Sequence, residues 1–423
     1  MSLPLEGIRV LDLSRLLPGG FCSLLLADLG ADVLKVEDTG MGDYIRWSPP
    51  YIEGADDSAK GALFLSLNRN KRSIRLDLKQ EQGREALLAL VREHDVVLES
   101  FRPGVLDRLG VGYERMREVN PGIVHCAISG YGQTGPKREA AGHDMNYLGL
   151  IGLLGLTGER GGEPVQAAGQ IADLGGGALM AAFGILAALH ERDGSPARGD
   201  RPARPGSGEG QIVDVSMADG ALSWLAMVAG AYFADGTVPQ RGDLPLAGSL
   251  ICYRPYECAD GWVTLGALEP KFWQAFCRGV GREELIERQF ERPGSPAHAE
   301  VQEIVRARTR VQWEQFARTH DCCLEPVLDL DEALESELVQ AREMVVEIDQ
   351  PGAAAPVRQL GLPVKLARTP GDHARLPGPA LGEHTEQALR EAGYSAEQIA
   401  ELLQSGAAVA GSAQPAMQAT FRA

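Results

Sequence analysis

The chain has 423 residues, of which 44% are hydrophobic and 23% are charged, as is usual for a folded protein with a large core. This length predicts two domains. The formal net charge of −17 argues against general nucleic-acid binding, because the mean field repels a phosphate backbone. An anionic ligand would therefore need a local basic cluster.

The seven cysteines form an odd set without a C-x-x-C spacing, which disfavours a disulfide scaffold and a zinc ribbon. The N-terminus lacks the basic patch and apolar core of a signal peptide. The longest uncharged apolar run, residues 174–189, falls short of the roughly 20 residues that span a bilayer. We therefore expect a cytoplasmic protein without a metal site, a membrane contact or a nucleic-acid partner, and a buried helix over this run.

The first part of the chain alternates buried strands with amphipathic helices, which predicts an α/β fold with a parallel, Rossmann-like sheet. The first strand-to-helix turn reads S-R-L-L-P-G-G and lacks the G-x-G-x-x-G of dinucleotide-binding proteins, so a nicotinamide cofactor is not expected. The predicted strands are residues 7–13, 33–37, 96–99 and 123–128, and the predicted helices are residues 21–29 and 82–94.

The middle of the chain predicts two long helices separated by a Gly-, Pro-, Arg- and Ser-rich surface loop, which we expect to be mobile. Short strands and further helices follow Pro239 and predict a smaller α+β domain. These elements are helices at residues 173–191 and 212–233, the loop at residues 192–210, strands within 256–265 and helices between 271 and 317. The predicted division is a large domain over 1–235, a small domain over 236–345, a C-terminal segment over 346–404 and a disordered tail over 405–423.

His143 and Asp173 are the residues best suited to proton transfer at a weakly acidic carbon. A histidine titrates near neutral pH, and an acid at a helix start lies beside unpaired backbone N–H groups that can hold a developing negative charge. Glycines 175–177 would let a substrate approach that backbone closely. Each residue also has a structural interpretation: Asp173 as a helix N-cap, and His143 as a partly buried, hydrogen-bonded histidine.

Many ordered segments resemble the family of class III CoA-transferases and α-methylacyl-CoA racemases, over nearly the whole chain to about residue 404. The matching segments are L-E-G-I-R-V-L-D (5–12), A-D-L-G-A-D-V (27–33), N-R-N-K-R-S (68–73), F-R-P-G-V (101–105), G-Y-G-Q-T-G-P (130–136) and L-G-E-H-T (381–385). Three further segments resemble the racemases: G-H-D-M-N-Y (142–147), A-D-L-G-G-G (172–177) and G-A-L-E-P (266–270). The transferases of this family share the aspartate, as a nucleophile, but generally lack the histidine.

This resemblance implies a large Rossmann-like domain built from the N-terminal half and the C-terminal segment, a small middle domain, and an interlocked homodimer with an active site at each interface. It implies His143 and Asp173 as opposing acid and base, with Glu269 orienting His143. Glu269 precedes Pro270, so simple turn chemistry is its alternative. No separate cofactor is implied, because coenzyme A is part of the substrate.

The resemblance also implies residues that contact the coenzyme. The run 69–75 is the densest basic patch, with a solvated charged face as its alternative interpretation. Related racemases carry a basic residue where this chain has Glu37 and Asp38, which puts coenzyme contacts at that corner in doubt. The residues predicted to bind acyl-CoA are Arg69, Arg72, Leu76, Asp77, Leu78, Lys79, Arg102, Arg108, Gly142, Asp144, Asn146 and Tyr147.

The predicted function is racemisation or epimerisation of a 2-methyl-branched acyl-CoA through an enolate. A CoA-transferase that uses Asp173 as its nucleophile is the first alternative, and a non-enzymatic CoA-binding protein is the second. Apolar residues around 147–156 and 224–232 would suit an acyl pocket, although such residues more often form plain core.

Overall fold

The computed structural model describes residues 2–198 and 202–411. It divides into two compact units, the first formed by residues 1–151, 167–224 and 340–423 and the second by 152–166 and 225–339. The predicted large domain ran unbroken to residue 235. The structure instead groups residues 152–166 and 225–235 with the second unit.

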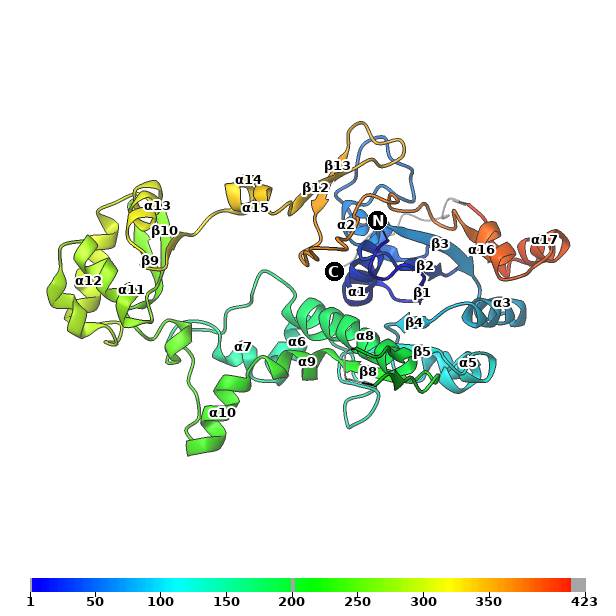
Figure 1. The fold of residues 1–423 in the computed structure, drawn as a ribbon, viewed down its shortest axis with the longest axis horizontal. Coiled ribbons are helices and arrows are strands. Elements are labelled where there is room, and N and C mark those ends of the chain that lie inside the picture. The colour runs from blue at the N-terminus through cyan, green and yellow to red at the C-terminus, as the bar shows by residue number, and fades with distance from the viewer. Residues whose placement is uncertain (1, 199–201, 412–423) are drawn as a thin grey trace. The chain divides into compact units, whose positions relative to one another are not determined.

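A seven-stranded sheet forms the centre of the first unit (Figure 1), in the order β14-β3-β2-β1-β4-β5-β8. All neighbouring strands are parallel except β14, which pairs antiparallel with β3. The chain therefore winds outward in one direction through β1, β2 and β3, and in the other from β4 to β5. The strands are β1 (Arg9–Asp12), β2 (Asp32–Glu37), β3 (Lys71–Leu76), β4 (Val96–Glu99), β5 (Val124–Ser129), β8 (Ile212–Ser216) and β14 (Ala408–Val409).

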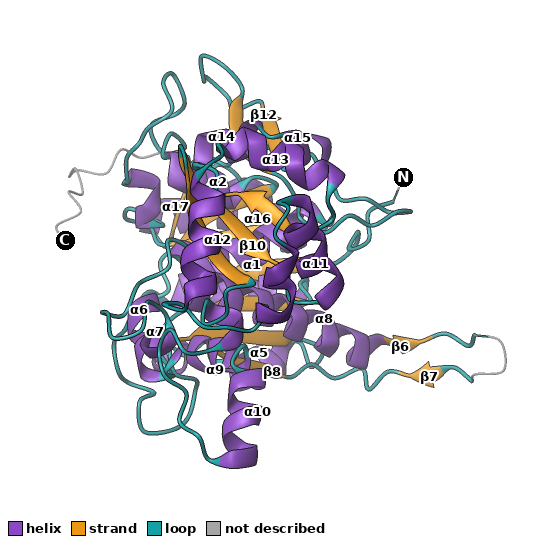
Figure 2. Cartoon of the chain, turned by 90° about the vertical axis from the view of Figure 1, so that its left-hand side faces the viewer, coloured by secondary structure: helices purple, strands orange, loops and turns teal. Residues whose placement is uncertain are grey.

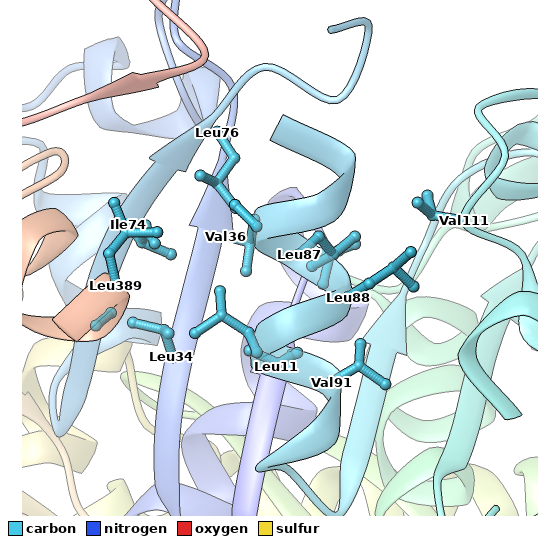
Figure 3. Packing of buried hydrophobic residues seen from close by; sticks show 14 of the residues in the cluster. Leu11, Leu34, Val36, Ile74, Leu76, Leu87, Leu88, Val91, Val111 and Leu389 are labelled. Carbon is cyan, nitrogen blue, oxygen red and sulfur yellow. The ribbon is translucent and has the colours of Figure 1, made fainter. Parts of the chain in front are cut away.

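Helices cover both faces of this sheet, as a parallel sheet requires. On one face, α1 packs against β1, β2 and β4, and α8 packs against β5 and β8. On the other face, Leu11, Leu34 and Ile74 of the strands meet Leu87 of α3 and Leu389 of α16 (Figure 3). The helices of this unit are α1 (Leu16–Asp28), η1 (Tyr44–Trp47), α2 (Ala62–Asn68), α3 (Glu81–Arg92), α4 (Val105–Arg108), α5 (Tyr113–Val119), α6 (Asp144–Leu150), η2 (Ile171–Leu179), α8 (Met180–Asp193), α9 (Met217–Ser223), α16 (Thr385–Glu391) and α17 (Ala396–Ser405).

The second unit has its own core around a three-stranded antiparallel sheet. Trp273 and Trp313 are fully buried there and lie within ring contact of Phe276. Its elements are α7 (Leu153–Leu156), α10 (Ala226–Asp235), η3 (Pro245–Ala247), β9 (Tyr253–Cys258), β10 (Gly261–Gly266), α11 (Pro270–Gly279), η4 (Glu283–Arg288), α12 (Pro296–Arg306), α13 (Arg310–Thr319), β11 (Leu324–Pro326) and α14 (Leu330–Glu335). Helix α15 (Glu337–Ala341) spans the boundary, and β12 (Val345–Ile348) pairs with β13 (Val357–Leu360) beyond it.

Three sequence-based predictions are corrected by these elements. The helix predicted over 212–233 begins as strand β8, because the β-branched side chains of Ile212, Val213 and Val215 favour an extended backbone. Residues 405–411 are not a free tail, because β14 pairs with β3; residues 412–423 lie outside the described part. The loop over 192–210 contains an antiparallel pair, β6 (Gly194–Ser195) with β7 (Arg204–Pro205), which runs beyond α8 (Figure 2).

The apolar helix is longer than the sequence suggested. Helices η2 and α8 form one run, Ile171–Asp193, whose 23 residues are long and apolar enough to cross a membrane by length and composition. The bent pair α9 and α10 meets the same criterion only if it is taken as one broken span. Half of the apolar stretch of Ile171–Asp193 is buried inside the protein, and η2 and α8 pack against α1 and β5. Buried core helices meet this criterion too, and the packing agrees with the expectation of a core helix.

The basic run 69–75 is not a surface patch, which corrects the predicted anion-binding role of Arg69 and Arg72. Residues 71–76 form β3, an interior strand that is buried along its length. Arg69 is 1% exposed and donates two hydrogen bonds to the Asp28 carboxylate, at 2.7 and 3.2 Å. Arg72 pairs with Asp32 at 2.7 Å and with Glu391 at 2.8 Å. These guanidinium groups neutralise carboxylates of their own fold.

Replacing Arg69 by Ala is expected to lower the free energy of unfolding by about 3–5 kcal/mol, because the buried Asp28 carboxylate would lose its bidentate partner. The urea midpoint measured by circular dichroism at pH 7 tests this. Arg115→Ala, which removes an exposed pair with Glu118, is the matched control and is expected to change the midpoint little. Equal losses in the two variants would contradict the buried role of Arg69.

Candidate functional site

A cavity of about 790 Å³ in the first unit lies where the winding of the sheet changes direction. Residues 15–18 follow β1, residues 100–103 follow β4, and residues 130–131 follow β5; all of them line this cavity. In open parallel sheets, ligands bind outside the carboxyl ends of the strands at such a switch point. The topology therefore makes this cavity the primary candidate site.

The turn after β1 is held from inside the protein by buried charges. Leu16 has φ of 61°, a left-handed conformation that is unusual for leucine. Its backbone N–H donates to the Asp43 carboxylate at 3.3 Å, and Asp43 pairs with Lys35 at 3.0 Å. The Lys35 ammonium also donates to the carbonyl of Ser14 at 2.8 Å. This arrangement fixes the segment that forms one wall of the cavity.

His143 reaches the cavity from the residue just before α6. Its backbone N–H donates to the Asn146 side chain at 3.0 Å, which closes the start of the helix. The Tyr147 hydroxyl donates to the carbonyl of Gly142 at 2.6 Å. The four residues Gly142, His143, Asn146 and Tyr147 were predicted from the sequence, and all of them line the cavity.

Asp173 lines the same cavity from the first turn of η2, a π-helical segment that begins at Ile171. The N-cap position belongs to Gln170, so Asp173 is not the helix cap that its sequence context allowed. Burial raises the pKa of Asp173 to about 6; the Asp144 carboxylate adds to this shift, and His143 opposes it. A carboxyl group with this pKa is populated in both protonation states near neutral pH.

Asp144 has a positioning role, which corrects its predicted contact with acyl-CoA. Its Oδ1 atom accepts hydrogen bonds from the backbone N–H groups of Ala172 at 2.7 Å and of Asp173 at 3.0 Å. Asp144 is buried and does not line the cavity. Because it follows His143 directly, one carboxylate ties the histidine segment to the aspartate segment.

The first backbone N–H groups of η2 are already used, which corrects their predicted role as donors to a substrate oxygen. Ala172 and Asp173 donate to Asp144, and Leu174 donates to the carbonyl of Gln170. The following glycines serve helix packing. A Cβ on Gly176 would lie 2.5 Å from the carbonyl oxygen of Met217, and one on Gly175 would lie 2.3 Å from the Trp224 ring.

A smaller cavity of about 150 Å³ adjoins the first, since Arg15 and Phe101 line both. The predicted residues Leu76, Asp77, Leu78 and Lys79 line it, at the end of β3 and directly after it. Glu37 and Asp38 line its other side, and they are ion-paired with Arg46 and Arg15, both at 2.6 Å.

The cations at the main cavity are Arg15, Arg102 and Arg138. Arg102 was predicted from the sequence, and it has no ion-pair partner within residues 2–198 and 202–411. Arg108 lies on α4 and lines neither cavity. Arg15 and Arg138 were missed; the position of Arg15 after the first strand of a parallel sheet was a usable signal, whereas no sequence signal marked Arg138.

Glu269 lies in the second compact unit, at the N-cap position of α11, with an exposed side chain. Its backbone carbonyl accepts the N–H of Phe272 at 3.0 Å, which fits the turn chemistry expected before Pro270. Its predicted role toward His143 stays a prediction. No group of three potential metal-binding side chains occurs among the described residues.

Comparison with known proteins gives a consistent family. The family model described as CoA-transferase family III matches residues 5–385. The chain is 35% identical over 404 residues to a succinyl-CoA:mesaconate CoA-transferase of Haloarcula marismortui, covering 92% of this chain and 96% of that protein. It is 34% identical over 407 residues to an alpha-methylacyl-CoA racemase of Mus musculus, covering 94% and 96%.

A solved structure agrees with these sequence relatives. The crystal structure of a CAIB/BAIF family protein from Brucella suis matches with a TM-score of 0.78 at 29% sequence identity. The match covers 93% of this chain and 100% of that chain.

The raised pKa of Asp173 has a consequence for stability. The folded state disfavours the charged carboxylate, so its cost grows as pH rises above the unfolded value of 3.8 and is complete above about 6. Asp173→Asn removes this cost and is expected to raise the free energy of unfolding by about 1–2 kcal/mol at pH 8, and by less at pH 5. Urea midpoints at the two pH values measure the difference; a variant less stable than the parent at both would contradict it.

Proposed function

The chain belongs to CoA-transferase family III, and from this membership we propose that it is a racemase or epimerase of 2-methyl-branched acyl-CoA thioesters. The family includes relatives named as racemases and relatives named as CoA-transferases. Membership therefore supports an enzyme that acts on CoA thioesters, and our proposal of racemisation rests on the residues of the site.

The observation that supports racemisation is the presence of His143 and Asp173 in one cavity. Inversion at C2 needs a group that removes the proton from one face and a second group that returns a proton to the other face. The Asp173 carboxyl group, whose pKa is raised to about 6, is able to take and give a proton near neutrality, and imidazole is the side chain most often used as a general acid and base. Acyl transfer would need the carboxylate alone.

In the proposed reaction, the His143 imidazole removes the C2 proton and the electron pair moves onto the thioester oxygen. The imidazolium then lies beside the enolate and stabilises its negative charge. The protonated Asp173 carboxyl group delivers its proton to the opposite face of C2, which completes inversion. The reverse reaction begins with the Asp173 carboxylate as base and ends with the imidazolium as acid.

We propose that the coenzyme extends from the main cavity into the smaller one. The residues Leu76, Asp77, Leu78 and Lys79 would border the nucleotide. Arg102, exposed in the main cavity, would face the phosphates. Coenzyme A thus enters as part of the substrate, and the reaction needs no further cofactor.

The proposed active form is a homodimer. Its support is the exposure of large apolar side chains on helices of both units, because monomers rarely leave such groups uncovered. Phe183 on α8 is 73% exposed, and Phe233 on α10 is 81% exposed. In such an assembly Glu269 would orient His143 and stabilise its imidazolium form.

A CoA-transferase is the second candidate, favoured by the likeness to the Haloarcula marismortui enzyme. Here the Asp173 carboxylate attacks the thioester carbonyl, the CoA thiolate leaves, and a mixed anhydride forms on the enzyme. The thiolate then attacks the Asp173 carbonyl of this anhydride, which releases the first acid as its carboxylate and leaves a thioester between Asp173 and CoA. The carboxylate of the second acid attacks that thioester, which gives a new anhydride with Asp173 and frees the thiolate again. Attack of the thiolate on the acyl carbonyl of the second acid forms the new acyl-CoA and releases the Asp173 carboxylate. Because the pKa of Asp173 is raised to about 6, the attacking carboxylate would predominate only above about pH 6.

Incubating one enantiomer of a 2-methylacyl-CoA in heavy water separates the candidates. The racemase is expected to place deuterium at C2 and to invert the centre without any acceptor acid, whereas the transferase requires a second carboxylate. His143→Ala should slow exchange from the enantiomer that uses His143 as base by about 10²–10⁴-fold and affect exchange from the other enantiomer less. His190→Ala, an exposed histidine on α8, is the matched control. Equal losses from both enantiomers would contradict two separate bases.

The pH dependence of exchange should differ between the two enantiomers. Exchange that begins with the Asp173 carboxylate is expected to fall below about pH 6, because protonation removes the base. Initial deuterium incorporation, measured by mass spectrometry between pH 5 and 8, tests this. Retention of full exchange at pH 5 from this enantiomer would exclude Asp173 as the base.

A further inference from the structure

A third cavity, of about 450 Å³, lies wholly within the second compact unit and has no role in the reaction proposed above. We propose that it binds a compact dianion, either a phosphate group or a small dicarboxylate. The walls come from residues 158–160, 242–243, 247–249, 254–255 and 292–293. Its lining side chains include three arginines against two carboxylates, in a chain whose overall charge is −17.

The cavity is a built feature, because hydrogen bonds join two of the segments that form it. The Arg241 guanidinium donates to the carbonyl of Gly155 at 3.0 Å and also to that of Gly162. Gly242 has φ of +69°, and a Cβ there would lie 2.2 Å from the backbone nitrogen of Arg160. Only glycine allows this approach. The loops are thereby held in place before any ligand arrives.

Two buried polar atoms at this cavity lack hydrogen-bond partners among the described residues. They are the hydroxyl oxygen of Ser249, a residue only 2% exposed, and the Nε atom of Arg254. Buried polar atoms in folded proteins are nearly always hydrogen-bonded, so each unpaired one requires a partner. Because both residues line the same cavity, a single ligand with acceptor oxygens would satisfy both.

The charges at the cavity favour an anion over a neutral ligand. Arg292 forms an ion pair with Asp243, so these two lining residues largely neutralise each other. Arg160 and Arg254 have no ion-pair partner in the described part of the chain, and the remaining lining carboxylate is the exposed Glu159. Guanidinium groups bind carboxylate and phosphate oxygens in a bidentate manner. Two such groups and a hydroxyl suit a ligand with two negative charges.

Isothermal titration calorimetry of the full chain with inorganic phosphate and, separately, with succinate tests this proposal at constant ionic strength. Saturable binding of phosphate alone, of succinate alone or of both supports it, and the pattern identifies the source of the dianion. Arg254→Gln and Ser249→Ala are each expected to weaken binding by about tenfold. Arg318→Gln, an exposed arginine on α13 that pairs with Glu314, is the matched control and should bind as the parent does.

A second control separates this cavity from the one that contains Asp173. Arg102→Gln alters the latter and is expected to leave dianion binding unchanged, whatever reaction the enzyme catalyses. Arg254 lies over the Tyr256 ring, so the Arg254→Gln variant could fail to fold. In that case Arg160→Gln takes its place, because the Arg160 side chain is exposed and its loss does not disturb the core. Absence of saturable binding to the folded parent, or loss of binding in Arg102→Gln but not in Arg254→Gln, would overturn the proposal.

Discussion

The carboxylate of Asp144 is the interaction on which the candidate site depends. It stands at the start of α6, directly after His143, and accepts two backbone hydrogen bonds from the start of η2. These bonds bring together two segments that are far apart in sequence, and they leave the Asp173 side chain free to line the cavity. The same carboxylate contributes to the raised pKa of Asp173. One buried group therefore holds the two segments together and adds to the rise that burial produces in the pKa of Asp173.

The sheet supplies the place where those segments meet. Parallel strands that wind in opposite directions from β1 and β4 leave a crevice at their carboxyl ends, and the turns after these strands form its walls. Buried charges stabilise those turns: Lys35 and Asp43 hold the turn after β1, and Arg46 pairs with Glu37 at the end of β2. Such pairs add little net stability compared with apolar side chains of similar size. They do favour the one loop conformation in which each buried charge has its partner.

The same reasoning explains how an acidic protein can bind polyanions. The mean field of a chain with net charge −17 repels them, so binding requires cations that the fold leaves unpaired. Most of the basic residues of the run 69–75 form ion pairs with carboxylates of the same unit. Arg102 beside the main cavity, and Arg160 and Arg254 in the second unit, form no ion pair with the described residues.

Hydrophobic periodicity identified the α/β class and strands β1, β2, β4 and β5. A buried parallel strand is a short continuous apolar run in the sequence, and this pattern predicts it directly. The motifs around His143 and Asp173 likewise identified two residues of one cavity. Strand β3 and the edge strand β8 were missed, since the first carries lysine and arginine and the second runs directly into a helix. Arg69 is not available to a ligand because it forms an ion pair with Asp28. Asp144 is not available to a substrate because it accepts hydrogen bonds from backbone N–H groups of η2. Those partners are distant in sequence, and electrostatic and hydrogen-bonding energies depend on distance in space, so only the tertiary structure decided them.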